Sequence, residues 1–319
     1  MAARPPMIPP AGTTAFLQAA GWEGAVEPLA GDASFRRYFR VRDNGRSAIL
    51  MDAPPAHEDS LPFIAVAEWL RARHFAAPAI LARDLEQGLL LLEDFGDARV
   101  AEVMAGEPSR EPAVYIAAID TLRALHGHAA GPFPPYDEAV LLREAALFIE
   151  WYMPSVGLEP APGFTDAWRA ALAPVADVRQ VTVLRDYHAE NIMLLADDRL
   201  GLLDFQDALA GHPAYDLVSL LQDARRDVAE PLEAAMLAHY GSVDPAAYAL
   251  LGAQRNTKIL GIFSRLWRRD GKDRYLKLQP RVWAYLERDL AHPALAEVKA
   301  WFDASVPVAQ RAAFWSNPA

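Results

Sequence analysis

The sequence predicts an α+β protein of two lobes, in which a small antiparallel β-rich lobe precedes a larger helical lobe. Three observations support this fold class. Strand-like alternation with the hairpin signal Asn44-Gly45 occupies the first part of the chain, apolar residues recur at helical spacing after Pro112, and an apolar strand runs into a polar joint at residues 93–96. We therefore expect a β-rich lobe over residues 1–95 and a helical lobe over residues 96–319, with a ligand-binding cleft between them.

The expected elements of the first lobe follow one another along the chain. A short helix ends at Gly21, and a second helix has Leu61, Ile64 and Leu70 on one side. Two strands flank the Asn44-Gly45 turn. The expected helices cover residues 13–20 and 60–75, and the expected strands cover residues 25–29, 35–41, 47–51, 80–81 and 89–92.

The second lobe is expected to be helical apart from three short strands. Apolar residues at helical spacing predict helices over residues 113–126, 136–152, 164–175, 215–223, 231–239, 245–266, 277–290 and 295–302. Short apolar runs predict strands over residues 181–184, 192–195 and 201–203.

The composition excludes several classes of function. The chain has 319 residues, of which 52% are hydrophobic, and its net charge of −11 does not suit a nucleic-acid partner, which calls for basic surface. The absence of cysteine excludes thiol chemistry, thiolate metal sites and disulfides. The first ten residues lack the apolar core of a signal peptide, and no apolar run approaches the ~20 residues that span a bilayer. We expect a cytoplasmic protein without nucleic-acid or membrane partners, and the sequence leaves the oligomeric state open.

The most informative pattern combines three oxygen-bearing side chains. Asp186 and Asn191 lie five residues apart in a polar loop, and Asp204 ends a short apolar strand. Mg²⁺ prefers hard oxygen ligands and keeps phosphate and water partners, so Asn191 and Asp204 can bind the metal while Asp186 accepts a proton from a hydroxyl. Two metal ligands and a proton acceptor are the groups needed to transfer a phosphoryl group from ATP to an alcohol. The alternative is a loop in which these side chains only cap backbone groups.

The stretch from Arg185-Asp186 to Asn191, together with Asp204, resembles the catalytic loop of the aminoglycoside phosphotransferase and choline kinase family. The resemblance implies a protein-kinase-like two-lobed fold, ATP and Mg²⁺ as cofactors, Asp186 as the catalytic base, and Asn191 and Asp204 as the metal ligands. Leu184 stands where the family usually has a His that supports the loop. We expect His188 to supply a compensating hydrogen bond.

Longer stretches resemble one branch of this family, the anomeric kinases of bacterial cell-wall recycling. The resemblance implies that the acceptor is an amino sugar, and that the enzyme phosphorylates the C1 hydroxyl of N-acetylmuramate and N-acetylglucosamine. It covers about residues 13–290 and is carried by residues 31–38, 148–152, 202–209, 214–224 and 275–283.

The hairpin that lies over the ATP phosphates is expected at residues 31–38, where Gly31 and Ser34 permit close approach of backbone N–H groups. The lysine that kinases carry on the third strand is missing, because all four lysines of the chain follow residue 257. Either an arginine (Arg36, Arg37 or Arg40) contacts the phosphates instead, or Mg²⁺ neutralises more of their charge; we expect the contact from Arg36 or Arg37. The two arginines lie on opposite faces of the strand, so at most one points inward. An ordinary hairpin with solvated arginines is the alternative.

The adenine ring is expected to bind at the joint. The apolar strand that ends there suits a flat aromatic base, and backbone groups from Glu93 to Phe95 would bond its edge. A buried strand followed by a linker would look the same in sequence.

Three residues are candidates for binding the acceptor. Asp207 follows the metal-binding Asp closely and suits sugar hydroxyls, while Trp151 suits the face of a pyranose. Arg265 is one of five cations at residues 255–269, any of which could pair with the lactyl carboxylate of N-acetylmuramate. Asp216, at the start of a helix, is expected to cap N–H groups rather than to bind substrate.

Two alternatives remain open. The same fold could act on another small alcohol, such as an aminoglycoside, choline or homoserine, and the acidic net charge suits a polycationic aminoglycoside. The chain could also be a catalytically weak nucleotide-binding module, because the strand lysine is missing and Leu184 replaces the usual His.

Overall fold

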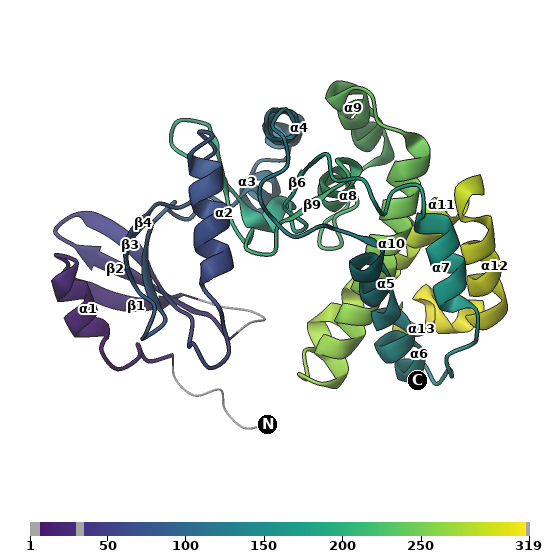
Figure 1. Ribbon diagram of the computed structural model, residues 1–319, viewed down its shortest axis with the longest axis horizontal. Coiled ribbons are helices and arrows are strands. Elements are labelled where there is room, and N and C mark those ends of the chain that lie inside the picture. Colours follow the sequence, from purple (N-terminus) through teal and green to yellow (C-terminus); the bar gives the residue numbers. More distant parts are fainter. Residues whose placement is uncertain (1–6, 30–34, 317–319) are drawn as a thin grey trace. The chain divides into compact units, whose positions relative to one another are not determined.

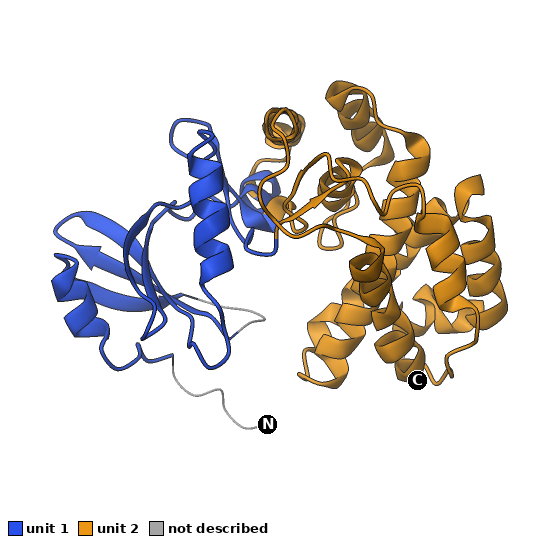
Figure 2. Cartoon of the chain, viewed as in Figure 1, with its two compact units in different colours: residues 1–105, 190–207 blue, residues 106–189, 208–319 orange. Residues whose placement is uncertain are grey.

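The computed structural model describes residues 7–29 and 35–316, and the chain forms two compact units (Figure 1, Figure 2). Unit 1 comprises residues 1–105 and 190–207, and unit 2 comprises residues 106–189 and 208–319. This division differs from the single boundary expected after residue 95. The reason is that the segment 190–207 folds onto the first unit: the backbone N–H of Leu194 donates to Ala98 (2.8 Å), and that of Leu202 donates to Ala76 (2.7 Å).

A five-stranded antiparallel sheet forms the centre of unit 1, with the strand order β1-β2-β3-β5-β4. Asn44 and Gly45 connect β2 to β3 and have positive φ values of 48° and 83°, as the tight hairpin turn that matches strand twist requires. The strands are β1 (Ala25–Leu29), β2 (Arg37–Asp43), β3 (Arg46–Asp52), β4 (Ile80–Asp84) and β5 (Leu89–Glu93).

The two faces of this sheet have different partners. Phe39 of β2 belongs to a buried cluster with Phe16 of α1 (Thr13–Ala19). Successive strand residues point to opposite faces, so Tyr38 lies on the face away from α1. Figure 1 shows α2 (Leu61–Arg71) on the side of the sheet opposite to α1.

A hairpin from a distant part of the sequence completes unit 1. It consists of β7 (Ile192–Leu194) and β8 (Leu200–Leu202), and α3 (Val100–Gly106) lies in the same unit. The sequence did not predict α3. Beyond β8, Phe205 is fully buried and stacks on Phe63 of α2 with 5.1 Å between ring centroids, which anchors the segment after the hairpin to that helix.

The helix α10 (Pro245–Arg268) is the longest helix of unit 2 and lies at its centre. It begins with Pro245 after Asp244, whose side chain accepts the N–H of Ala246 (2.9 Å), a favourable N-terminal cap. The surrounding elements are α4 (Glu111–His126), α5 (Glu138–Leu147), α6 (Met153–Ser155), α7 (Phe164–Leu172), α8 (Ala214–Leu221), α9 (Glu230–Tyr240), α11 (Gln279–Leu290), α12 (Ala296–Ser305), α13 (Ala312–Ser316), and the strands β6 (Val181–Val183) and β9 (Leu209–Gly211).

The continuous helix expected over residues 136–152 is interrupted. After α5 the chain forms a π-helical turn, η2 (Phe148–Tyr152). α10 approaches the end of α5 closely at Gly261. A Cβ at this position would lie 2.3 Å from the carbonyl carbon of Leu147, the last residue of α5. Phe148 and Tyr152 are fully buried, whereas Trp151 is only half-buried. Such π-helical turns frequently occur at functional sites.

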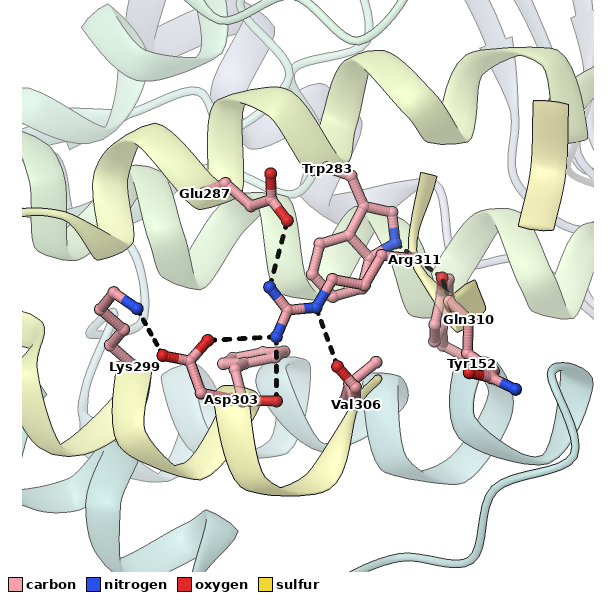
Figure 3. A network of polar contacts seen from close by, with 9 residues as sticks. Tyr152, Trp283, Glu287, Lys299, Asp303, Val306, Gln310 and Arg311 are labelled. Carbon is pink, nitrogen blue, oxygen red and sulfur yellow. Dashed lines mark hydrogen bonds and ion pairs between the residues drawn. The ribbon is translucent and has the colours of Figure 1, made fainter. Parts of the chain in front are cut away.

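Arg311 connects the C-terminal segment to the core of unit 2 (Figure 3). Its guanidinium contacts Asp303 of α12 and Glu287 of α11, each at 3.1 Å, and lies 5.5 Å from the ring centroid of Trp283. The indole N–H of Trp283 donates to the Tyr152 hydroxyl (2.7 Å). Contacts of Arg311 thus extend through Trp283 to Tyr152, the buried last residue of η2. Among the described residues, no helix combines the length and apolarity needed to cross a bilayer.

Arg311→Ala should lower the free energy of unfolding by about 2–3 kcal/mol, because Glu287 loses a donor, Asp303 loses one of its two donors and Trp283 loses its covering guanidinium. Urea denaturation measures this. Arg169→Ala is the control, since Arg169 also contacts two carboxylates, Glu138 and Asp166, but on an exposed surface, where the expected loss is below about 1 kcal/mol. Equal losses in the two variants would contradict the bracing role of Arg311.

Candidate active site

The loop that carries Asp186 begins at the end of β6. This strand is buried and pairs with β9. The chain leaves it through Arg185, whose φ of 71° lies in the left-handed region that reverses the chain. One residue after Asp186, the Tyr187 hydroxyl donates to the backbone oxygen of Ala118 in α4 (2.9 Å). This hydrogen bond fixes the loop to α4 directly after Asp186.

Asp216 of α8 holds the other end of this loop. Its two carboxylate oxygens accept the backbone N–H groups of Leu184 (2.7 Å) and Arg185 (2.8 Å). Burial raises the pKa of the Asp216 carboxyl to about 7, although both hydrogen bonds favour the charged form. Asp216 therefore does cap N–H groups, but they belong to the loop of Asp186 and not to its own helix. This contact supports the loop although Leu184 replaces the usual His.

A buried ion network lies beside the loop. The carboxylate of Glu144 contacts Lys258 Nζ at 3.0 Å and also binds the guanidinium of Arg185. The Tyr136 hydroxyl donates to the same carboxylate. Burial alone would raise the pKa of Glu144, but Lys258 and Arg185 lower it. Because buried charges are costly unless they are paired, this network makes Arg185 and Lys258 compatible with the core.

The environment of Asp186 keeps its carboxyl group ionised. The residue is half-buried, and burial alone would raise its pKa. The positive charges of Lys258, Arg255 and Arg185 outweigh that effect and hold the pKa of Asp186 below its usual value. An ionised carboxylate is an acceptor for hydrogen bonds, so Asp186 can orient a substrate hydroxyl at neutral pH.

His188 is buried, and its Nε2 lies 3.2 Å from Arg225 Nη1. A guanidinium only donates hydrogen bonds, so the imidazole nitrogen accepts this one. Burial and the Arg225 charge lower the pKa of His188 to about 4. The bond expected from His188 is therefore made to the Arg225 side chain, while Asp216 makes the bonds to the loop backbone.

Asn191 and Asp204 flank the β7–β8 hairpin of unit 1. Asn191 directly precedes β7, and its backbone oxygen accepts the N–H of Leu203 (2.9 Å), just beyond β8. Asp204 follows with a φ of 56°. The side chains meet, with Asn191 Nδ2 lying 3.3 Å from Asp204 Oδ2, and Gln206 donates to Asp204 Oδ1 (2.9 Å). The structure thus brings together the two oxygen-bearing side chains that the sequence predicts as metal ligands.

The donor set of this pair fits Mg²⁺. Over residues 7–29 and 35–316, no group of three or more His, Cys, Asp or Glu side chains could hold a metal. Mg²⁺ differs from metals that need such a cage, because it is usually bound by one or two protein oxygens and completes its octahedron with phosphates and water. Asn191 and Asp204 supply such oxygens, and the buried ring of Phe205 anchors the second of them.

Arg36, which directly precedes β2, and Arg37, its first residue, have different partners. Arg36 pairs with Glu58 at 3.2 Å, and both side chains are largely buried. Glu58 also accepts the backbone N–H of Phe35 (3.2 Å). Arg37 instead donates to the buried carboxylate of Asp52 (2.6 Å). Gly31 and Ser34 lie outside the described residues.

The phenol of Tyr38 is influenced both by Arg36 and by Asp204 of the metal-ligand pair. Burial, Asp204 and Glu58 raise the pKa of the Tyr38 phenol, whereas Arg36, which also forms a hydrogen bond with it, lowers that pKa. These influences place Arg36, Tyr38 and Asp204 in one electrostatic environment within unit 1. Because Tyr38 lies on the sheet face away from α1, Arg36 is on the side that also carries Asp204.

The joint at residues 94–97 is held by Arg40. This guanidinium contacts Asp94 and Asp97, each at 2.8 Å, and Asp94 also accepts the N–H of Gly96 (2.9 Å). Burial alone would raise the pKa of Asp94, but these donors lower it. Arg40 is therefore engaged at the joint, which leaves its neighbours at the start of β2 as candidates for the phosphates.

The side chains of Glu93 and Phe95 belong to a cavity of about 270 Å³ within unit 1. Glu93 accepts the N–H of Ala79 (3.0 Å). Phe95 packs so closely on Gly201 that a Cβ there would lie 2.7 Å from its ring. The cavity is lined by Arg71, His74, Phe75, Ala76, Glu93, Phe95, Leu195 and Arg199.

The three acceptor candidates lie in both units. Trp151 is on η2 and Arg265 is on α10, and both are half-buried in unit 2. Asp207 is exposed in unit 1, on the segment after Phe205. The sequence did not single out Glu144 or Glu58, because only the folded chain reveals that an acid is buried against a base.

Asp216→Asn should increase amide hydrogen exchange at Leu184 and Arg185 by roughly 10–100-fold. The reason is that Asn offers one acceptor oxygen where the carboxylate offers two, and a hydrogen bond to a charged group contributes ~1.5–3 kcal/mol. Hydrogen exchange read by NMR or mass spectrometry measures this without any substrate. Asp137→Asn at the N-cap of α5 is the control and should leave these two amides unchanged. Unaltered exchange in Asp216→Asn would refute the role of Asp216.

The chain is similar to known proteins over most of its length. The chain is 39% identical to the N-acetylmuramate/N-acetylglucosamine kinase of Caulobacter vibrioides, over 94% of this chain and 98% of that protein. It is 40% identical to the N-acetylmuramate/N-acetylglucosamine kinase of Pseudomonas aeruginosa, over 85% and 86% of the two chains. The crystal structure of a choline kinase from Streptococcus pneumoniae superposes with a TM-score of 0.62 at 14% identity, covering 89% of this chain and 97% of that one.

The last structure has too little sequence identity to indicate more than the fold, and it confirms the predicted protein-kinase-like architecture. The family model described as "Phosphotransferase enzyme family" matches residues 25–251. This span includes the loop of Asp186, the Asn191 and Asp204 pair, and the supporting Asp216. The chain therefore belongs to the phosphotransferase enzyme family.

Proposed function

We propose that the protein is a cytoplasmic, ATP-dependent kinase that phosphorylates the C1 hydroxyl of N-acetylmuramate and N-acetylglucosamine in peptidoglycan recycling. The observation that carries the proposal is an ionised Asp186, fixed by Asp216, in a loop that leads within five residues to the paired side chains of Asn191 and Asp204. The names of the relatives that share 35–40% identity with most of the chain supply the sugar.

The proposed roles follow from the chemistry of each side chain. Asn191 and Asp204 would hold Mg²⁺, which when bound neutralises phosphate charge. Asp186 accepts the hydrogen bond of the anomeric hydroxyl, orients it toward the γ-phosphoryl group and takes its proton late in the transfer. Positioning and charge neutralisation provide most of the rate. Glu144 and Lys258 act indirectly, because they hold the segment at Arg185 in place.

We assign the phosphate contact to Arg36. It lies in the same environment as Tyr38 and Asp204, and Glu58 provides the carboxylate partner that a glutamate gives the strand lysine in protein kinases. For adenine, the backbone N–H of Glu93 already donates to Ala79 (2.8 Å). We therefore propose that the backbone groups that follow Glu93, up to Phe95, bond the base.

Phosphorus NMR of the product formed from N-acetylmuramate, ATP and Mg²⁺ tests the proposed function, because it reports both turnover and the position phosphorylated. We expect a sugar 1-phosphate from the native protein. Asp186→Asn should reduce kcat by roughly 10³-fold or more, because the amide does not accept the hydroxyl proton, and should leave ATP binding intact. An ADP-release assay against aminoglycosides, choline and homoserine is the comparison. Preference for one of those alcohols, or full turnover by Asp186→Asn, would contradict the proposal.

Arg36→Ala should weaken ATP binding by roughly 10–100-fold and leave AMP binding nearly unchanged, because a charge-assisted contact to the outer phosphates is lost while adenine contacts remain. Isothermal titration calorimetry with both nucleotides measures the ratio.

The control for this experiment is Arg42→Ala. Arg42 lies on β2, the strand that follows Arg36, and pairs with Glu27 at 3.2 Å, as Arg36 does with Glu58, but the side chains of Arg42 and Glu27 are both exposed. Arg42→Ala should bind ATP and AMP like the native protein. If Arg36→Ala lowers the affinity for both nucleotides equally, the residue supports the fold of unit 1 and does not contact phosphate.

A further inference from the structure

The cations at residues 255–269 differ in one respect that the sequence does not reveal. Four of the five have a partner. These pairs are Arg255 with Ser219 (2.9 Å), Lys258 with Glu144 (3.0 Å), Arg268 with the ring of Trp267 (5.2 Å) and Arg269 with Asp270 (2.7 Å).

Arg265 is the exception. The residue is half-buried, and its Nε is shielded from solvent without a hydrogen-bond partner. Within the described part of the chain, no ion pair or hydrogen bond engages its guanidinium. Burial and the neighbouring charge of Arg269 lower the pKa of Arg265, and the opposing charges of Asp270 and Glu150 do not fully offset them. A half-buried cation without an ion-pair contact is costly, and binding an anion would offset that cost.

Arg265 is on the same helix as Lys258, a cation that acts on Asp186. Lys258 and Arg265 are seven residues apart on α10, which is close to two helical turns, so they lie on the same face about 10 Å apart along the axis. Lys258 is the cation that acts most strongly on Asp186. Both residues belong to unit 2. Arg265 is thus on the helix face whose Lys258 acts on Asp186.

The π-helical turn η2 packs against α10. Gly261, which lies between Lys258 and Arg265, allows the close approach of α10 to the end of α5. Glu150 of η2 is among the charges that act on Arg265, and its neighbour Trp151 is half-buried. Arg265 therefore lies beside a π-helical turn that is held from the core side by Tyr152.

We propose that Arg265 is the specificity-determining residue of an anion subsite, and that it binds a carboxylate carried by the sugar acceptor. This inference rests on the proposed function and deepens it. N-acetylmuramate carries a lactyl carboxylate on O3, whereas N-acetylglucosamine has a neutral hydroxyl there. A guanidinium binds a carboxylate through two parallel N–H groups. Arg265 therefore favours the carboxylated sugar without being required for the neutral one.

The surrounding charges favour a monoanion. Arg269 is neutralised by Asp270, and the remaining charges near Arg265 are its own and that of Glu150. A dianionic phosphate would bring a larger negative charge close to Glu150 than a carboxylate does, and the repulsion would be greater. The site is therefore suited to a substrate carboxylate and not to a second phosphate group.

The test compares kcat/KM for N-acetylmuramate and N-acetylglucosamine in the native protein, Arg265→Ala and Arg265→Lys. Arg265→Ala should lower kcat/KM for N-acetylmuramate by roughly 10–100-fold, mostly through KM, and change that for N-acetylglucosamine by less than about twofold. Arg265→Lys should recover part of the loss, because it restores the charge but not the two parallel donors.

Arg268→Ala is the control, since Arg268 is exposed and contacts the ring of Trp267; this variant should leave kcat/KM for both sugars unaffected. An equal loss for the two sugars in Arg265→Ala, or no loss, would overturn the subsite. If the native protein phosphorylates neither sugar, the proposed function fails separately. Calorimetric binding of the two sugars to native protein and Arg265→Gln then tests the subsite, which is refuted if their affinities keep the same ratio.

Discussion

The contact on which the candidate active site depends is the pair of hydrogen bonds from the loop backbone to the buried Asp216 carboxylate. The backbone N–H groups of Leu184 and Arg185 each donate one of these hydrogen bonds. Arg185 adopts a left-handed φ directly before Asp186. A non-glycine residue keeps such a conformation only when its surroundings enforce it. Asp216, Glu144 and Tyr187 provide that enforcement from three different helices or loops. The orientation of Asp186 is therefore a property of the whole core of unit 2.

Charge pairing explains much of the rest of the molecule. Glu144 balances Arg185 and Lys258, Glu58 balances Arg36, and Arg40 is balanced by two acids at the joint. Arginine suits these ion pairs because its planar guanidinium presents several N–H donors, two of which can bind one carboxylate at the same time. Arg265 differs, because among the described residues no carboxylate forms an ion pair with its half-buried guanidinium, and the proposed acceptor carries a carboxylate that would do so.

The outcome of the sequence predictions depended on the range of the interactions. Helices and strands with strong periodicity lie where the pattern predicts them, as in α2 and α10. The π-helical turn at Phe148–Tyr152 was not predicted; it follows Leu147, which Gly261 of a distant helix approaches closely, and such a contact is not encoded in the local pattern. The assignment of residues 190–207 to unit 1 was also missed, since it results from backbone hydrogen bonds to Ala76 and Ala98 that no local pattern encodes.

The sequence alone determined the identity and spacing of Asp186, Asn191 and Asp204, the absence of a strand lysine and the two-lobed α+β class, because these follow from residue types and local periodicity. The tertiary structure alone decided which cations have partners. Arg36 and Arg37 look equivalent in sequence, yet one pairs with Glu58 and the other with Asp52. The physical reason is that a charge is neutralised by the groups that folding brings within a few ångströms of it, and those groups come from distant parts of the chain.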